Sequence, residues 1–163
     1  MKDSAKIIIS GLGGQGIRAF GVILGNLLVQ RGYEISMLAD YDSASRGGTI
    51  VTHFVYGSGR IENPVIDSPD IWIKFADTPK SFNAKEFIYD KLFCKEKSGK
   101  GYDFSKMGKE KFGKPIYGNS IAIGKILKIL GVDLKDFDIK KALPAKLRKD
   151  DSNEMAVKLG YGL

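Results

Sequence analysis

Cysteine and histidine are almost absent from this sequence: its 163 residues contain one of each, Cys94 and His53. A single cysteine excludes an intrachain disulfide, and it excludes an iron–sulfur or zinc site built from cysteines of this chain alone. One histidine removes most histidine-based zinc chemistry as well. We therefore expect no metal site here, with Cys94 a small buried apolar residue and His53 a hydrogen-bonded structural residue within a strand.

Long hydrophobic runs and linker-like segments are missing too. No stretch approaches the roughly 18 consecutive apolar residues of a membrane-spanning helix. The opening residues "MKDSAK" lack the layout of a secretory signal. No segment is rich enough in proline or serine to separate two domains, and the chain has only 5 prolines. We therefore expect a cytoplasmic protein without membrane contact, in which residues 1–163 form a single domain.

The charge of the chain is unevenly distributed. Residues 80–149 carry 18 basic and 8 acidic residues, whereas the whole chain has a net charge of +7. Such a basic half favours contact with nucleic acid, phosphorylated ligands or an acidic protein, or it forms a solvated lysine surface. Because lysines greatly outnumber arginines there and no recognition motif is evident, a nucleic-acid-binding module is only a remote alternative.

The hydrophobic pattern alternates between strand and helix signals. Short apolar runs predict strands at 6–10, 33–39, 70–76 and within 86–94, and a glycine-rich turn at 57–59 predicts a hairpin that joins 49–57 to 60–66. Apolar residues three and four apart predict a helix over 16–31, and further helices are expected at 119–131, capped by Asn119 or Ser120, at 133–143 and at 151–160. This order predicts an α/β fold: a three-layer α/β/α Rossmann-like domain with a mostly parallel sheet, an added hairpin and C-terminal helices.

The stretch "GLGGQG" directly follows the first predicted strand and opens the first predicted helix. Gly11, Gly13 and Gly16 match the G-x-G-x-x-G spacing, in which glycines permit a tight turn, close approach to a phosphate and close helix packing. Asp40 is a candidate for the ribose-binding acid that this motif places about 20 residues later. The same glycines also suit a turn that only lets the helix pack on the sheet, and Gln15 also suits capping of backbone groups.

A second polar loop, "YDSASRGGT" at 41–49, follows the second predicted strand. Together with Gly14 and Gln15 of the turn, it resembles the gamma subunit of the 2-oxoacid:ferredoxin oxidoreductases, which act on pyruvate, ketoisovalerate, 2-oxoglutarate or indolepyruvate. The resemblance covers 1–75 and 115–163. It continues in "ENPVIDSPDIWI", "GNSIAIG" and "NEMAVKLG", through Pro64, Pro69, Asp70, Asn119, Gly124, Asn153, Ala156 and Gly160.

The resemblance implies a division of labour within a larger enzyme. Such enzymes decarboxylate a 2-oxoacid on thiamine diphosphate, pass electrons through iron–sulfur clusters to ferredoxin, and release an acyl-CoA. It implies that thiamine diphosphate, Mg and the clusters belong to partner subunits, and that CoA is a candidate ligand of this chain. The implied partners are alpha and beta subunits and a ferredoxin-like delta subunit or domain, or a second copy of the chain when it is isolated.

We expect the two glycine loops to lie side by side, because the loops at the carboxyl ends of the strands form the crevice of an open α/β sheet. Arg46 suits a phosphate or a carboxylate of a partner, although Asp40 or Asp42 would also suit it as an ion-pair partner. No catalytic residue is predicted. The predicted binding residues are Gly11, Gly13, Gly14, Gln15, Gly16, Tyr41, Ser45, Arg46, Gly47 and Gly48.

One alternative enzyme class is a free-standing NAD(P)-dependent dehydrogenase built on the same glycine turn. It needs a general acid or base, and the chain offers only His53, without any Tyr-x-x-x-Lys pair. On the gamma-subunit interpretation, the isolated chain is inactive as an oxidoreductase.

Overall fold

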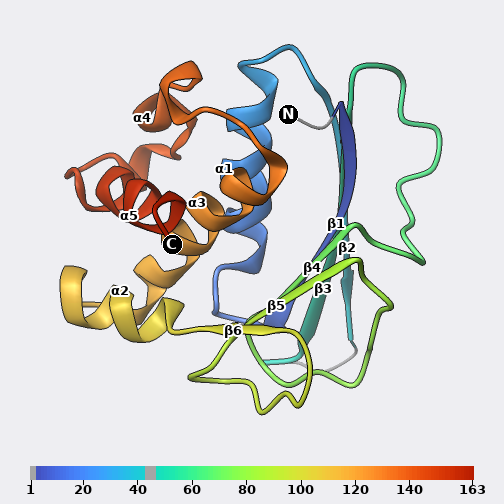
Figure 1. The fold of residues 1–163 in the computed structure, drawn as a ribbon, viewed down its shortest axis with the longest axis horizontal. Helices are drawn as coiled ribbons and strands as arrows, with labels where there is room; N and C mark the ends of the chain where they lie inside the picture. Colours follow the sequence, from blue (N-terminus) through green and yellow to red (C-terminus); the bar gives the residue numbers. More distant parts are fainter. Residues whose placement is uncertain (1–2, 43–46) are drawn as a thin grey trace.

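The computed structural model describes residues 3–42 and 47–163. Within them, a mixed sheet of six strands is covered by helices on one face (Figure 1). The strands lie in the order β2-β3-β1-β4-β5-β6. Their bounds are Ser4–Leu12 (β1), Glu34–Tyr41 (β2), Thr49–Gly57 (β3), Ile71–Lys74 (β4), Glu86–Asp90 (β5) and Lys100–Tyr102 (β6).

The sheet combines a parallel half with an antiparallel half. Strands β1, β4, β5 and β6 are parallel, whereas β3 runs antiparallel to both of its neighbours, β1 and β2. The expected α/β class and mostly parallel sheet are confirmed. From β1 the chain passes through α1 to β2 on one side of the sheet, and from β4 it passes to β5 on the other side. The carboxyl ends of β1 and β4 are therefore the point at which the connections leave in opposite directions.

The hairpin lies elsewhere than the sequence predicts. Its strands are β2 and β3, whereas residues 60–66 contain no strand, so the pairing of 49–57 with 60–66 is wrong. The Asn63 side chain accepts the backbone N–H of Val65 at 2.9 Å, and Pro64 has no N–H to give to a sheet. The chain therefore turns, and Ile66 donates its N–H to Nδ1 of His53 instead of to a strand.

The helices are α1 (Ile17–Val29), α2 (Phe104–Phe112), α3 (Gly118–Leu130), α4 (Ile139–Ala142) and α5 (Ser152–Tyr161), with 3₁₀ turns η1 (Pro115–Tyr117), η2 (Leu134–Asp136) and η3 (Ala145–Leu147). Those expected at 16–31, 119–131 and 151–160 are confirmed. The one expected at 133–143 is interrupted, because the side chains of Asp133 and Asp138 each accept a backbone N–H and start two short helical turns. No described helix is long and apolar enough to cross a membrane.

The third layer of the sandwich consists of loops. In Figure 1 the helices all lie on one side of the sheet, and the segments 58–70 and 75–85 run across the other. There Trp72 is buried, stacks on Phe87 with ring centroids 4.3 Å apart and donates to Oγ of Ser10 at 2.8 Å. Ile8 and Ile66 belong to the same cluster. The expected three-layer α/β/α arrangement therefore lacks its second helical layer, and aromatic packing under loops takes the place of that layer.

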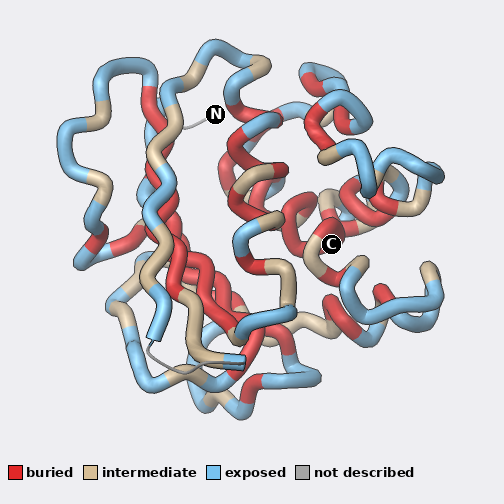
Figure 2. The backbone as a smooth tube through the Cα atoms, turned by 180° about the vertical axis from the view of Figure 1, so that it is seen from behind, coloured by how far each residue is buried: buried red, intermediate tan, exposed pale blue. Residues whose placement is uncertain are grey.

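The main core fills the space between the sheet and the helices, where Figure 2 shows the buried parts of the chain facing one another. Phe20, Leu24, Phe54 and Ile123 are fully buried there. Each such side chain contributes about 1.5–3 kcal/mol through removal from water. Helices α3 and α5 pack closely because Gly160 of α5 has no side chain: a Cβ there would collide with the backbone of α3.

Candidate functional site

The glycine turn joins β1 to α1 and takes a conformation that only glycine adopts easily. Gly14 and Gly16 have φ angles of 90° and 74°, in the left-handed region. Gly11 has no room for a side chain, because a Cβ there would lie 2.6 Å from Ile17 Cδ1 and 2.7 Å from Gln15 Oε1. Gly13 and Gly14 themselves are exposed. The turn therefore presents bare backbone to solvent.

Gln15 holds this turn against the sheet. Its Oε1 accepts the backbone N–H of Leu12 at 2.7 Å, and its Nε2 donates to the carbonyl of Phe75 at 3.1 Å. The side chain thus bridges the carboxyl ends of β1 and β4, and both of its polar atoms are used. Gln15 therefore binds backbone groups of the turn and of the end of β4 and does not cap α1, which has no side-chain cap, and we assign Gln15 to the support of the site.

Asn119 secures the turn from the helical side. Its Nδ2 donates to the carbonyl of Gln15 at 2.8 Å. The expectation that Asn119 or Ser120 caps α3 is wrong, because the helix begins at Gly118 without any side-chain cap. The side chain reaches instead to a residue 104 positions earlier, so α3 and the turn are fixed to each other.

The two glycine loops are in contact, as predicted. The N–H of Gly13 donates to the carbonyl of Gly48 at 2.9 Å, and a Cβ on Gly13 would lie 3.5 Å from Gly47 Cα. The base of the second loop is closed by Asp42, whose carboxylate accepts the N–H of Thr49 at 2.7 Å. The structure therefore brings 13–16 and 47–48 together on one surface.

Two of the predicted site residues, Ser45 and Arg46, lie outside the described residues. Of the others, Tyr41 is 61% exposed at the end of β2. A groove of about 570 Å³ connects it to Gly14 and Gly16 and passes along Arg18, in the first turn of α1. Arg18 is exposed and forms no ion pair within the described parts of the chain.

Arg18 is a candidate anion-binding residue that the sequence analysis missed. Its position in the sequence, two residues after the last glycine of the turn, could have identified it, because the first turn of such a helix faces the ligand. A cation, a free helix start and bare glycine backbone together favour a negatively charged partner or ligand on this face.

Asp40 does not take the place of a ribose-binding acid, so that expectation is wrong. In a dinucleotide-binding domain the second strand neighbours the first, whereas here β3 separates β2 from β1. The Asp40 carboxylate lies 3.3 Å from Nζ of Lys80 and 3.4 Å from Nε2 of His53, on the loop-covered face. The space between the turn and Phe75 is only about 190 Å³, too small for a dinucleotide.

The remaining reactive side chains serve the fold. His53 is buried, and its Nδ1 accepts the Ile66 N–H at 3.0 Å. Cys94 is buried too, and burial raises the pKa of its thiol to about 12. Lys74 is buried, and hydrogen bonds to Glu96 and Asp77 raise its pKa although burial alone would lower it. Among the described residues, no group of three His, Cys, Asp or Glu side chains is placed to hold a metal ion.

Comparison with known proteins gives consistent matches over the whole chain. The family model of pyruvate ferredoxin/flavodoxin oxidoreductases matches residues 6–163. The 2-oxoglutarate synthase subunit KorC of Archaeoglobus fulgidus is 25% identical over 167 residues, which cover 99% of this chain and 88% of KorC.

Two solved structures share the fold. The gamma subunit of a keto/oxoacid ferredoxin oxidoreductase from Geobacter sulfurreducens PCA has a TM-score of 0.76 at 19% identity, and the match covers 99% of this chain and 96% of that one. The 2-oxoglutarate:ferredoxin oxidoreductase of Magnetococcus marinus, solved with 2-oxoglutarate, coenzyme A and succinyl-CoA, has a TM-score of 0.77 at 18% identity. There the match covers 99% of this chain and 31% of the larger one.

Proposed function

Because the chain belongs to the pyruvate ferredoxin/flavodoxin oxidoreductase family and is a gamma subunit of a 2-oxoacid:ferredoxin oxidoreductase, we propose that it docks the thiamine-diphosphate subunits and helps to bind CoA. The proposed site consists of the predicted residues of the two glycine loops together with Arg18, with Gln15 as the residue that holds the turn. The chain acts as one domain, residues 1–163. It supports the CoA-dependent conversion of a 2-oxoacid to an acyl-CoA, and it supplies no catalytic residue.

The contact between the two glycine loops carries this proposal. The Gly13–Gly48 hydrogen bond of 2.9 Å joins a turn that follows β1 to a loop that precedes β3. Because both loops expose glycine backbone, a ligand can approach them more closely than it can approach side chains. CoA suits such a surface, since its phosphates accept backbone N–H groups and arginine side chains.

The neighbouring edge of the sheet supports a docking role. Strand β2 is an edge strand, and its Met37, Leu38 and Tyr41 are exposed apolar residues that continue from the groove. Unpaired strand edges readily accept another chain. Obligate interfaces often bury more than about 2,000 Å², so the alpha and beta subunits would cover this edge together with the loops.

The cofactors of the reaction belong to the partner subunits in this proposal. The described residues offer no metal-binding cluster, and the one cysteine of the chain is buried. A single buried cysteine does not fit an iron–sulfur cluster held by this chain alone. Its residues would orient CoA and hold the subunits together while decarboxylation and electron transfer take place elsewhere, with a ferredoxin-like subunit or domain as a further partner.

CoA kinetics in the assembled enzyme test the proposal. Replacing Arg18 or Arg46 with Ala should raise the apparent KM for CoA about tenfold, because each variant removes one charge-assisted hydrogen bond. The matched control is Arg60→Ala, which removes an exposed arginine in the segment that follows β3. Unchanged CoA kinetics together with unchanged assembly in both test variants would refute the proposed role of this face.

A further inference from the structure

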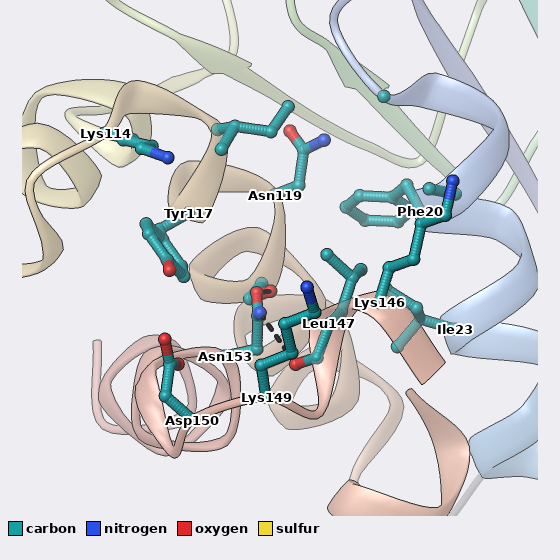
Figure 3. Close-up of a pocket in the computed structure, with 14 residues that line it drawn as sticks. Phe20, Ile23, Lys114, Tyr117, Asn119, Lys146, Leu147, Lys149, Asp150 and Asn153 are labelled. Carbon is teal, nitrogen blue, oxygen red and sulfur yellow. Dashed lines mark hydrogen bonds between the residues drawn. The ribbon is translucent and has the colours of Figure 1, made fainter. Parts of the chain in front are cut away.

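A separate cavity lies on the helical side of the molecule, where α1, α3 and α5 begin (Figure 3). Its volume is about 360 Å³, within the range of about 300–1,000 Å³ that is usual for small-molecule sites. Of the binding residues predicted from the sequence, only Gly16 lines it. The cavity shares Gly16 and Asn119 with the glycine turn and its support, but its lysines and its apolar floor lie outside the proposed CoA-binding face.

The floor of this cavity is apolar and fixed. Phe20 and Ile23 of α1 are buried, and Leu147 of η3 and the ring of Tyr117 complete the wall. Figure 3 shows the Phe20 and Tyr117 rings on opposite sides of the opening. Such a surface suits a flat, largely apolar group.

A short hydrogen-bond chain holds the wall in place. Oγ of the buried Ser120 donates to Oδ1 of Asn153 at 2.8 Å, and Nδ2 of Asn153 donates to the carbonyl of Leu147 at 3.1 Å. These bonds tie α3, α5 and η3 to one another. The cavity is thus formed before any ligand binds, which lowers the cost of binding.

Three lysines surround the opening from different sides: Lys114, Lys146 and Lys149 (Figure 3). All three are exposed, and none forms an ion pair within the described residues. Asp150 is the single acidic residue of the lining, and its carboxylate accepts the N–H of Ser152 at the start of α5. The lining therefore carries a net positive charge.

This pairing of cations with an apolar floor selects a class of ligand. Three ammonium groups favour a phosphate, and the positive ends of the α1 and α5 dipoles add to their field. The aromatic and aliphatic floor favours a ring system, and the volume limits the ligand to a small molecule. We propose that this cavity is a binding site for a phosphorylated small molecule with a flat ring, of the size of a nucleoside monophosphate.

Thermal unfolding of the full chain with AMP, GMP, CMP and UMP tests this proposal, with adenosine and inorganic phosphate as separate probes. At least one monophosphate should raise the Tm by more than adenosine or phosphate does, and added salt should weaken the effect. The double variant Lys146→Gln, Lys149→Gln should bind that nucleotide about tenfold more weakly or worse. The double variant Lys109→Gln, Lys135→Gln, which removes two exposed lysines outside the cavity and so changes the charge equally, should bind it normally.

Three outcomes would overturn the proposal: no monophosphate raises the Tm, the double variant retains full affinity, or phosphate alone matches every nucleotide. Arg18→Ala and Arg46→Ala should leave monophosphate binding unchanged. Loss of monophosphate binding in these arginine variants would place the nucleotide on the glycine loops and would also overturn the proposal. Failure of this site and failure of the proposed CoA face therefore remain distinguishable.

Discussion

Gln15 offers the sharpest test of how the glycine turn is held. Gln15→Glu keeps the shape of the side chain and one oxygen that accepts the Leu12 N–H. It replaces the amide nitrogen that donates to the Phe75 carbonyl at 3.1 Å with a second oxygen. A carboxylate cannot donate there, so two acceptors would face each other in a half-buried crevice.

The size of the effect follows from the lost bond and the orphaned carbonyl. A hydrogen bond contributes about 0.5–1.5 kcal/mol, and an unsatisfied buried acceptor costs about 1–3 kcal/mol more. We expect the variant to be less stable by about 2–4 kcal/mol at pH 7. For a chain of this length each kcal/mol lowers the Tm by about 2–4 °C, so the Tm should fall by about 5–15 °C.

The loss should also depend on pH, in a direction that the geometry fixes. When the new carboxyl group at position 15 is protonated, it can donate to the Phe75 carbonyl and restore the bond, so folding raises the pKa of that carboxyl above its unfolded value. The stabilisation that this carboxyl group contributes is therefore complete below its unfolded pKa, and it is lost as the pH rises through its folded pKa. The Tm difference between the variant and the wild type, measured from about pH 4 to about pH 8, should grow with pH. A variant as stable as the wild type at pH 7, or a difference independent of pH, would refute the assignment of Gln15 as a bridge between β1 and β4.

Two further predictions concern stability and reactivity. Gly160→Ala should destabilise the fold by about 1–3 kcal/mol, because the new Cβ would collide with the α3 backbone. The control Gly25→Ala, whose new Cβ would have its nearest neighbours at 3.5 Å, should stabilise the fold by up to about 1 kcal/mol through helix propensity. Equal unfolding temperatures for the two variants would contradict the close crossing of α3 and α5. Because burial raises the Cys94 pKa from 9.0 to about 12, the native thiol should resist iodoacetamide at pH 8, and its contribution to stability should decline from about pH 9 upwards. Labelling of the native protein as fast as of the unfolded protein would show that the thiol is accessible.

The sequence predicts those parts of the fold that depend on local pattern. The helix at 16–31 follows from apolar residues three and four apart, and the contact between the glycine loops follows from the rule that loops at the carboxyl ends of strands meet. Strand pairing is a long-range property. The hairpin partner of β3 is β2 and not residues 60–66, which turn at Asn63 and Pro64. The sequence shows these two residue types but not their effect on strand pairing.

The supports of the site were harder to predict than its glycines. Gln15 binds a carbonyl 60 residues away, and Asn119 binds one 104 residues away. No local signal distinguishes such a bond from a helix cap, because the same amide group suits both. Asp40 fits the spacing of a ribose-binding acid, but it lies on an edge strand that β3 separates from β1.

Reconstitution of the whole enzyme tests the central claim most directly. The alpha, beta and ferredoxin-like subunits of a 2-oxoacid:ferredoxin oxidoreductase are assayed for 2-oxoacid- and CoA-dependent ferredoxin reduction, with and without this chain. We predict that the isolated chain is inactive with NAD(H) or NADP(H), and that the partners need it for full CoA-dependent turnover. Reduction of NAD by the isolated chain with a hydroxy acid, or full turnover by the partners without it, would contradict the account.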